Sequence, residues 1–273
     1  MVRALWTGAS GMNAQQVSLD NIANNLANVN TTGYKKQTTE FSSLLYQKLQ
    51  RTQTDNNGDP KPVLAQVGTG VRVTALTSIF TQGIMQETGN ENDYCIEGQG
   101  FFRILMPNGT EAYTRNGAFQ MAIDGDGVTL STAEGYPVLD QDGDIIHFNT
   151  NEYDVSNLYT DEYGRFTYRD TENDDVIDTG IRIGLAQFNN PSGLDKLSNS
   201  IFRESLNSGE PRYEVEDTAL SISKIHAKYL EGSNVQTVDE IVNLITTQRA
   251  YEMNSKIISA ADEMMQQANN LRS

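Results

Sequence analysis

Two short acidic runs contain the residues whose types and spacing could do chemistry. Asp124-Gly125-Asp126-Gly127 and Asp140-Gln141-Asp142-Gly143-Asp144 alternate carboxylates with other residues, as calcium-binding loops do. An EF-hand loop needs Gly at its sixth position and Glu at its twelfth, but a loop that begins at Asp140 has Ile145 and Asn151 at these places. Since Asp and Gly are also the residues that tight turns require, the pattern favours β-turns over a calcium site.

Other catalytic or ligand-binding patterns are weak. The dense acids could supply the carboxylate pair of a glycosidase, but they are more typical of a solvated face. No P-loop, dinucleotide fingerprint or Ser/His/Asp order occurs, and Gly98-Gln99-Gly100 is too short to cradle a phosphate. The single cysteine, Cys95, is expected to be buried, and His147 and His226 leave little for a zinc site. We therefore expect no enzyme activity, no metal and no cofactor.

The composition is that of an acidic, soluble protein. The 273 residues carry 36 acids and 20 bases, a net charge of −16, and 37% of them are hydrophobic. Such a charge repels phosphate backbones, so nucleic acid is not an expected partner. The sequence has neither the run of about 18 apolar residues of a membrane helix nor the apolar core of a signal peptide. We expect no membrane insertion and no Sec export.

Apolar residues repeat every seven positions near the start of the sequence. The repeat consists of Leu5, Met12, Leu19 and Leu26, followed three positions later by Gly8, Gln15, Ile22 and Val29. Over residues 2–29 this pattern predicts a coiled-coil-like helix of about 42 Å. Thr31-Thr32-Gly33 is expected to end it, because Gly commonly terminates helices.

The end of the sequence has the same seven-residue spacing of apolar residues, with more apolar surface. Residues 235–273 contain neither Gly nor Pro and predict a helix of about 50 Å. One apolar column repeats at Leu244, Tyr251, Ile258 and Met265, and an adjoining one at Ala250, Ile257, Met264 and Leu271. A hairpin with residues 2–29 would cover one column only, and surplus apolar surface marks an interaction site. The alternative is that both helices pack on the central domain as ordinary core.

Asparagine is concentrated in the first helix, with five between Asn21 and Asn30. Asparagine is a mediocre helix former, but its amide can be buried against identical copies without the desolvation cost of an ion. A solvated polar face is the alternative interpretation. The residues expected at an assembly interface are Leu5, Met12, Leu19, Ile22, Asn24, Asn25, Leu26, Asn28, Val29, Leu244, Tyr251, Ile257, Ile258, Met264 and Met265.

Between the helices the sequence predicts antiparallel β structure. Residues 66–80 alternate as one or two strands. Residues 101–105, 111–115 and 118–121 predict three short strands joined by tight hairpins at Pro107-Asn108-Gly109 and Asn116-Gly117. Further strands are expected near Val138 and in residues 145–148, 166–168 and 181–188. The expected fold class is α+β, with two terminal helices that pair and an inserted β-rich domain.

Both ends of the sequence resemble the rod, hook and hook-associated proteins that form the bacterial flagellar axis. The N-terminal signature is SGMNAQQVSLDNIANNLANVNTTGYKK from Ser10, and the C-terminal one is EGSNVQTVDEIVNLITTQRAYEMNSKIISAADEMMQ from Glu231. Within this family, the distal rod subgroup is most similar in three segments: MVRALWTGASGM, EGQGFFRILMPNGTEAYTRNGAFQ and the linker-like QKLQRTQTDNNGDPKPVLAQV. Residues 150–228, which include most of an acidic stretch at 140–178, match only loosely.

The resemblance implies a structural subunit of the flagellar basal body that is exported through the type III apparatus and polymerises helically into the distal rod. Its partners would be other copies of itself, the proximal rod proteins and the hook protein. The expected domains are an N-terminal helical half (1–45), an extended linker (46–70), a β-rich domain (71–227) and a C-terminal helical half (228–273). A proximal rod or other hook-basal-body protein is the alternative within the family. A secreted calcium- or carbohydrate-binding β domain is the alternative outside it.

Overall fold

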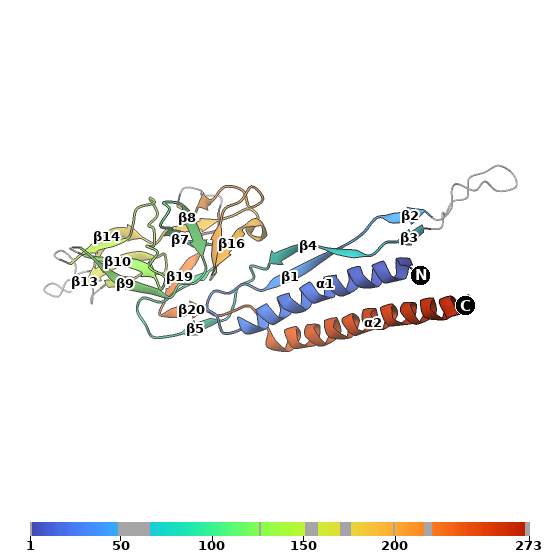
Figure 1. The fold of residues 1–273 in the computed structure, drawn as a ribbon. Helices are drawn as coiled ribbons and strands as arrows, with labels where there is room; N and C mark the ends of the chain where they lie inside the picture. Colours follow the sequence, from blue (N-terminus) through green and yellow to red (C-terminus); the bar gives the residue numbers. More distant parts are fainter. Residues whose placement is uncertain are drawn as a thin grey trace. The chain divides into compact units, whose positions relative to one another are not determined.

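A computed structural model describes residues 2–48, 66–125, 127–150, 158–169, 176–198, 200–215 and 220–270 of the chain. Two helices, α1 (Val2–Ala27) and α2 (Thr237–Asn270), enclose a series of antiparallel strands in the sequence (Figure 1). This arrangement confirms the α+β class. In the part of the chain that is described, neither helix is apolar enough over a sufficient length to cross a membrane.

The chain divides into two compact units. The first consists of Met1–Ala27, Gln37–Thr77 and Gln236–Ser273, and the second of Asn28–Lys36 and Ser78–Val235. Residues 71–77, which the sequence assigned to the β-rich domain, therefore group with the helices. Residues 28–36, which directly follow α1, group with the β-rich unit.

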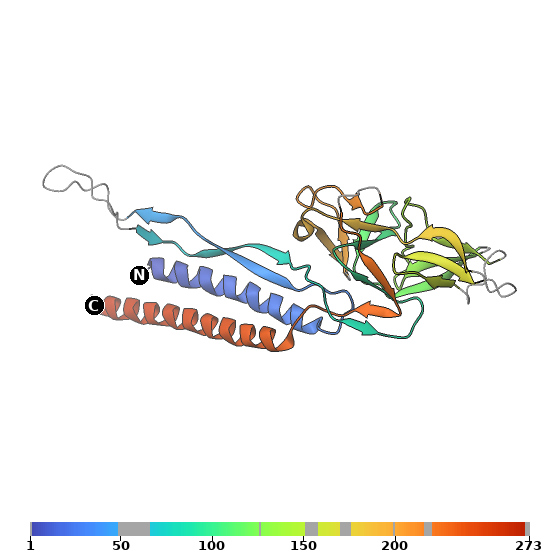
Figure 2. The same cartoon turned by 180° about the vertical axis from the view of Figure 1, so that it is seen from behind.

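The two helices of the first unit lie side by side and antiparallel (Figures 1 and 2). They approach most closely where α1 has glycine. A Cβ atom on Gly8 would lie 3.0 Å from Cγ1 of Ile258, and one on Gly11 would lie 2.9 Å from Nδ2 of Asn254. Gly8 occupies an inner position of the heptad repeat, where a larger side chain would hold α2 away.

Paired strands cover a second face of α1. β1 (Gln37–Ser43) pairs with β4 (Val71–Ser78), and β2 (Tyr46–Lys48) pairs with β3 (Gln66–Gly68). Asn21 and Asn25 of α1 donate hydrogen bonds from Nδ2 to the Gln37 carbonyl at 2.9 and 2.8 Å, and Asn25 Oδ1 accepts the Gln37 N–H at 3.0 Å. Within this unit, α1 therefore has α2 on one face and the strands on another. The central part of the expected linker, residues 49–65, lies outside the described residues.

The second unit contains one large sheet and several small ones. Its six-stranded sheet has the order β16-β17-β8-β7-β15-β18. The strands are β7 (Phe101–Leu105), β8 (Glu111–Thr114), β15 (Leu185–Gln187), β16 (Asp195–Ser198), β17 (Ile201–Arg203) and β18 (Arg212–Tyr213). The expected hairpin at Pro107-Asn108-Gly109 is confirmed, because β7 and β8 pair antiparallel.

Two three-stranded sheets and two strand pairs complete the second unit. The three-stranded sheets are β9 (Phe119–Asp124), β10 (Gly127–Thr132) and β11 (His147–Asn149), and β12 (Leu158–Thr160), β13 (Arg165–Arg169) and β14 (Val176–Arg182). The pairs are β5 (Met85–Glu87) with β20 (Tyr229–Glu231), and β6 (Tyr94–Glu97) with β19 (Lys224–Ala227).

The expected second hairpin, at Asn116-Gly117, is wrong. The strand that follows it, β9, pairs with β10 in a different sheet from β8. Asn116 Oδ1 accepts the Ala118 N–H at 3.1 Å, which turns the chain locally, and Gly117 lies directly against the Tyr94 carbonyl oxygen. Gly117 is thus needed for a close backbone approach, not for the positive φ of a hairpin turn.

Alternation along β7 divides the core of the second unit in two. Phe102 and Ile104 belong to the larger cluster, with Leu130, Phe148 and Phe166 among its buried members. Phe101 points to the other side, where it packs with Tyr113, Ala186, Phe188 and Phe202. Side chains of successive strand residues face opposite sides of a sheet, so the six-stranded sheet is buried on both faces in this region.

The Asp140 run forms a turn. Asp140 Oδ1 accepts hydrogen bonds from the N–H groups of Asp142 and Asp144, both at 2.9 Å, and Gly143 has a φ of +93°. This is the conformational use of Asp and Gly that the sequence favoured. Cys95 is fully buried, as expected.

We expect Gly117→Ala to lower the free energy of unfolding of the second unit by about 1 to 3 kcal/mol, because the methyl group would displace the Tyr94 backbone. Gly68→Ala is the control: its methyl group would lie 3.5 Å from the Tyr46 ring, an ordinary van der Waals contact, so we expect little destabilisation. Urea unfolding followed by circular dichroism measures both variants. Equal destabilisation by the two variants would contradict the packing described.

Candidate assembly surface

Helix α2 carries a stripe of apolar side chains that the described residues leave exposed. We call these residues the outer stripe: Val238, Ile241, Val242, Ile245, Met253, Ile257 and Met264. Val238 is 73% exposed, Ile257 49% and Met264 51%. Among the described elements of this unit, α1 is the one that packs along α2 (Figure 2), and the outer-stripe side chains are left exposed. Contiguous apolar surface of this kind on a water-exposed helix is typical of an interaction site.

The inner face of α2 forms a seam with α1. Ile258 meets Gly8 in this seam. Leu244, which precedes Ile258 by two heptads, and Met265, one heptad after it, lie in the same column, and all three residues are half-buried. On α1, Ile22 is buried, and the half-buried residues are Leu5, Met12, Leu19 and Leu26. These predicted interface residues are therefore already partly buried by contacts within one chain.

The predicted interface set separates into two groups that the sequence could not distinguish. Ile257 and Met264 belong to the outer stripe, whereas their neighbours Ile258 and Met265 lie in the seam. Tyr251 lies between the groups at 36% exposed. The sequence shows two adjacent apolar columns on this helix, but which of them packs against α1 is known only once the position of α1 is known.

The asparagines also divide. Asn24 is exposed, Asn28 and Val29 are half-buried, and Asn25 is buried with its amide on the Gln37 backbone and 3.3 Å from Oε2 of Glu240. The Asn25 amide therefore already makes hydrogen bonds within its own chain. A side-chain amide offers a donor and an acceptor, which match the free N–H and C=O of a strand end.

Met253 is an outer-stripe residue that was missing from the predicted interface. The sequence signal for it was its position four residues before Ile257, which places both on one helical face. Val238, Ile241, Val242 and Ile245, in the first turns of α2, are also all exposed.

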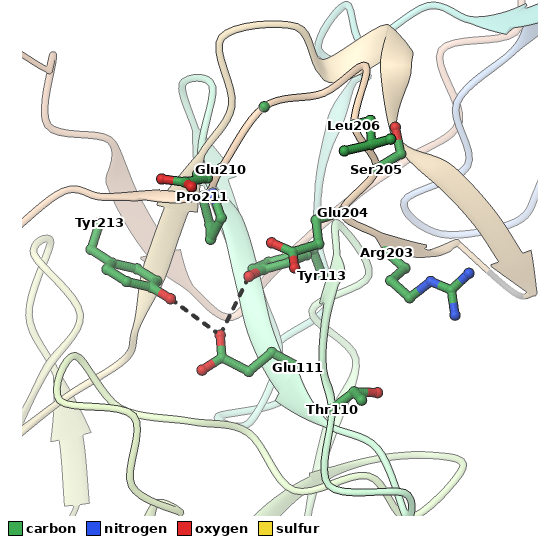
Figure 3. Close-up of a pocket in the computed structure, with 11 residues that line it drawn as sticks. Thr110, Glu111, Tyr113, Arg203, Glu204, Ser205, Leu206, Glu210, Pro211 and Tyr213 are labelled. Carbon is green, nitrogen blue, oxygen red and sulfur yellow. Dashed lines mark hydrogen bonds between the residues drawn. The ribbon is translucent and has the colours of Figure 1, made fainter.

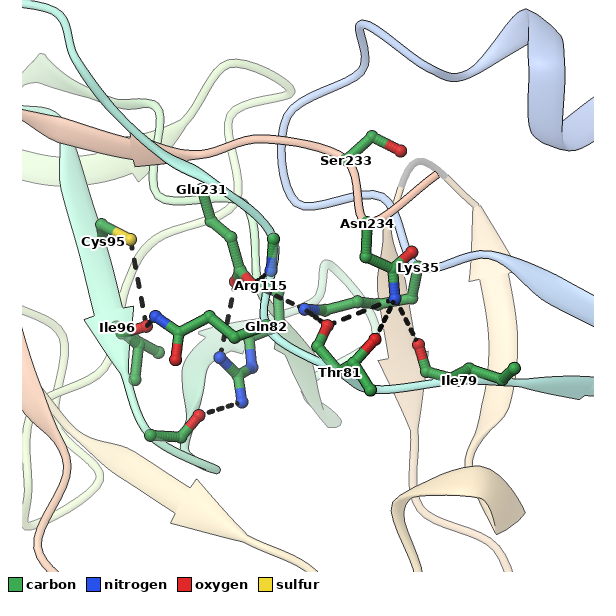
Figure 4. A network of polar contacts seen from close by, with 12 residues as sticks. Lys35, Ile79, Thr81, Gln82, Cys95, Ile96, Arg115, Glu231, Ser233 and Asn234 are labelled. Atoms are coloured by element: carbon green, nitrogen blue, oxygen red, sulfur yellow. Dashed lines mark hydrogen bonds and ion pairs between the residues drawn. The ribbon is translucent and has the colours of Figure 1, made fainter. Parts of the chain in front are cut away.

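A buried ion cluster holds the segments that lead to and from the helices. Lys35, which follows α1, lies 2.6 Å from Oε1 of Glu231 in β20, and Arg115, which follows β8, lies 3.4 Å from Oε2 (Figure 4). All three side chains are almost inaccessible to solvent. Lys35 also donates to the Thr81 carbonyl at 2.9 Å, and Arg115 to the Gly98 carbonyl at 2.7 Å.

Backbone hydrogen bonds and Asn234 complete this cluster. The Gly33 N–H donates to the Glu231 carbonyl at 2.7 Å. Asn234 accepts the Lys36 N–H at 2.7 Å and donates to the Ile79 carbonyl at 2.7 Å (Figure 4). The two segments that connect the second unit with α1 and α2 are therefore tied to each other and to the β structure.

Burial dominates the electrostatics of the cluster. Desolvation lowers the pKa of Lys35 and of Arg115, and the carboxylate of Glu231 opposes both shifts. Desolvation also raises the pKa of Cys95 to about 12, so that thiol is not a reactive thiolate. None of these three charged residues was singled out from the sequence, because an isolated Lys, Arg or Glu carries no periodic or motif signal.

His226, for which the sequence offered no partner, pairs with an acid across β6 and β19. Its Nε2 atom lies 2.8 Å from Oε2 of Glu97. This hydrogen bond lowers the pKa of Glu97. Strand pairing brings the two residues together over a long sequence separation.

Three family models match the chain. They are described as flagella basal body rod protein (residues 5–35), flagellar hook protein FlgE/F/G D1 domain (residues 95–168) and flagellar basal body rod FlgEFG protein C-terminal (residues 226–271). Two relatives are the flagellar basal-body rod proteins FlgG of Borreliella burgdorferi, 41% identical over 100% of this chain and 99% of its own length, and of Agrobacterium fabrum, 43% identical over 96% and 97%. The chain belongs to the FlgG family of flagellar basal-body rod proteins.

Membership in the FlgG family places the chain among structural proteins of the flagellar basal body. The flagellar hook-basal body complex protein FlhP of Bacillus subtilis is also similar, at 29% identity over 100% of each chain. The rod and C-terminal family models cover α1 and α2, and the D1 model covers much of the second unit. The family resemblance read from the two ends of the sequence is confirmed.

We expect Glu231→Gln to destabilise the second unit by about 3 to 5 kcal/mol, because it leaves Lys35 and Arg115 buried without a counter-charge. Glu162→Gln is the control: it removes the partner of Lys224 from an exposed pair, and such pairs contribute little. Chemical denaturation of the two variants and the unchanged protein gives the comparison. If both variants unfold like the unchanged protein, the buried cluster is not what holds the connecting segments.

Proposed function

We propose that the chain is a distal rod subunit that polymerises helically through the outer stripe of α2. The observation that carries this proposal is the row of apolar side chains on α2 that α1 does not cover. In this function the outer stripe packs against helices of neighbouring copies, while the seam with α1 stays within each copy and forms a coiled-coil-like pair. The interface of the polymer then consists mainly of Ile257, Met264 and their exposed neighbours.

The energy available from the outer stripe is sufficient for assembly. Full burial of an aliphatic or methionine side chain contributes roughly 1.5 to 3 kcal/mol, and about half of that remains available for a half-exposed one. Seven such residues on each copy, repeated along a helical polymer, favour the assembled state strongly. Association costs entropy once per copy, so a long stripe is needed to exceed it.

The buried ion cluster suits a subunit that carries torque. The segment that follows α1 and the segment that precedes α2 are two of the covalent connections along which mechanical load passes between the helices and the β unit of one copy. Lys35, Glu231 and Arg115 join these segments to β8 by short charged contacts inside the second unit. Such contacts are directional and resist sliding better than apolar packing does.

The proposed route and partners follow from the family. The subunit is exported through the flagellar type III apparatus without cleavage, and the finished rod joins proximal rod proteins to the hook protein. It has no catalytic role in this function. A proximal rod or other hook-basal-body position is the second candidate, which the similarity to FlhP favours.

Ile257→Asp is expected to abolish polymerisation and leave the monomer stability nearly unchanged, because Ile257 is on the exposed stripe. Ile258→Asp, one residue later, places a charge against Gly8 in the seam and should destabilise the first unit. Loss of helical circular dichroism reports unfolding of that unit, and electron microscopy with sedimentation reports polymers.

Ser259→Asp is the matched control, since it adds the same charge at an exposed, polar position of α2. It should polymerise normally. Polymers formed by Ile257→Asp as readily as by Ser259→Asp would rule out the outer stripe as the assembly surface.

Hydrogen exchange should separate the two units before assembly. In the monomer we expect fast exchange in α1 and α2 and strong protection in β7 and β8, because the helices expose an apolar face while those strands are buried on both faces. In the polymer the helices should become protected. Strong protection of residues 2–29 in the monomer would contradict the idea that assembly completes the helical unit.

A further inference from the structure

A groove of about 840 Å³ lies beside the six-stranded sheet of the second unit (Figure 3). Glu111 and Tyr113 of β8 and Tyr213 of β18 form its floor, and residues 204–211, which connect β17 to β18, form its wall. The volume is within the range of roughly 300 to 1,000 Å³ that ligand-binding sites have. The groove shares no residue with the outer stripe, so the proposed polymer contact gives it no role.

One carboxylate holds the floor of the groove in place. Glu111 accepts hydrogen bonds from the hydroxyls of Tyr113 at 3.3 Å and Tyr213 at 3.5 Å (Figure 3). The buried Arg103 donates to both oxygens of Glu111, from Nη2 at 2.9 Å and from Nε at 3.3 Å. Its guanidinium also lies 4.2 Å from the centre of the Tyr213 ring. These contacts orient both phenols within the free chain.

The floor carries little surplus charge. The Glu111 carboxylate is balanced by the guanidinium of Arg103. Burial, followed by the charge of Glu111, raises the pKa of Tyr113 and of Tyr213, so both phenols stay protonated at neutral pH. A phenol that donates its proton to Glu111 still has an oxygen that accepts hydrogen bonds. The floor therefore suits a ligand that brings uncharged hydrogen-bond donors.

The wall of the groove is also formed in the free chain. Ser205 donates from its hydroxyl to the Gly193 carbonyl at 2.6 Å, and its N–H donates to the Ser208 hydroxyl at 2.9 Å. Asn190 donates to the Asn207 carbonyl at 3.0 Å. A ligand therefore meets a preorganised groove and loses little affinity to ordering it.

The rim combines strong acceptors with apolar surface. Glu204 and Glu210 are exposed carboxylates, and the hydroxyl of Thr110 is exposed beside them in the lining. Leu206 is fully exposed and Pro211 is half-buried. A sugar has matching features, because its hydroxyls donate and accept hydrogen bonds while the C–H groups on its ring faces pack on aromatic and aliphatic side chains. Hydrogen bonds to an ionised carboxylate are the stronger ones.

We propose that this groove binds a neutral oligosaccharide. In this complex the sugar hydroxyls donate to Glu204, Glu210 and the phenol oxygen of Tyr213, and one ring face packs on Tyr213 and Pro211. The two exposed glutamates exclude acidic saccharides, because like charges repel across an interface. The proposal concerns binding, and no step of bond cleavage is part of it.

An organic cation is the competing ligand, since three glutamates line the groove. The floor disfavours it, because the charge of Glu111 is already balanced by Arg103. Arg203, the basic residue of the lining, lies 3.8 Å from Asp195. The two ligand classes also differ in salt dependence: salt screens exposed charges and weakens the binding of a cation, but has little effect on a neutral ligand.

The test is isothermal titration calorimetry of the full-length chain, at a concentration at which sedimentation shows single chains. The probe is the β-1,4-linked tetramer of N-acetylglucosamine, which is uncharged and whose acetamido methyl groups suit the apolar Leu206 and Pro211. We expect saturable binding with nearly equal affinity at about 20 and about 300 mM NaCl. The tetramer of galacturonic acid should not bind, and spermidine should bind more weakly than the neutral sugar.

Two variants locate the binding site. Tyr213→Ala should weaken sugar binding by about tenfold or more, because it removes the ring and the hydroxyl together. Glu204→Ala, at an exposed position, should weaken it by about threefold or more. Tyr159→Ala is the matched control, since it removes a 47% exposed tyrosine from β12, outside the groove. It should bind the sugar like the unchanged protein.

Circular dichroism and urea unfolding verify that the variants remain folded, and Glu204→Ala decides the question if Tyr213→Ala does not fold. The absence of saturable sugar binding would overturn the proposal, and so would equal binding by Glu204→Ala and Tyr159→Ala. Tighter binding of spermidine than of the sugar, lost at high salt, would overturn it in favour of a site for organic cations. Loss of polymers in Ile257→Asp with unchanged sugar binding would leave the groove assignment intact, because the titration uses single chains.

Discussion

Helix α2 has more apolar surface than α1, the element that packs along it in the described part of the chain, covers. It is 34 residues long, and α1 occupies a single face of it, where Gly8 and Gly11 let the two helices come close. Ile257 and Met264 therefore stay exposed next to half-buried Ile258 and Met265. A subunit with this surface reaches its lowest free energy as part of an assembly.

The second unit differs in that it is complete by itself. Its core is closed on both sides of the six-stranded sheet, and the connecting segments are fastened within it by the contacts of Lys35, Glu231 and Arg115. A buried cluster of two cations and one anion is costly to desolvate and adds little stability over an apolar core. The cluster instead contributes specificity: it determines which residues contact one another, and it resists their displacement. For a rod protein, that means that the segment after α1 and the segment before α2 are each held at a defined anchor point.

The hydrogen bonds that the polar side chains of this protein make cannot be predicted from residue type alone. Asparagine at positions 21 and 25 looked suited to contacts between copies, but both amides hydrogen-bond the Gln37 backbone. Asn234 similarly joins the segments around Lys36 and Ile79. An amide side chain can hydrogen-bond backbone N–H and C=O groups that have no partner in a β-sheet. The same chemistry would have served an intermolecular contact, so the residue type could not decide between the two.

The sequence by itself determined the two helices, the β7–β8 hairpin and the family, because heptad spacing, Asn-Gly turn chemistry and long terminal signatures are local properties of the chain. It also determined that α2 has surplus apolar surface. Only the tertiary structure decided that Ile258 packs against α1 within the chain while Ile257 stays exposed. It also decided that Gly117 lies against Tyr94 instead of forming a hairpin, and that Glu231 pairs with Lys35. Each of these depends on which distant segment packs alongside. Residues far apart in the sequence carry no periodic signal of the contact they make.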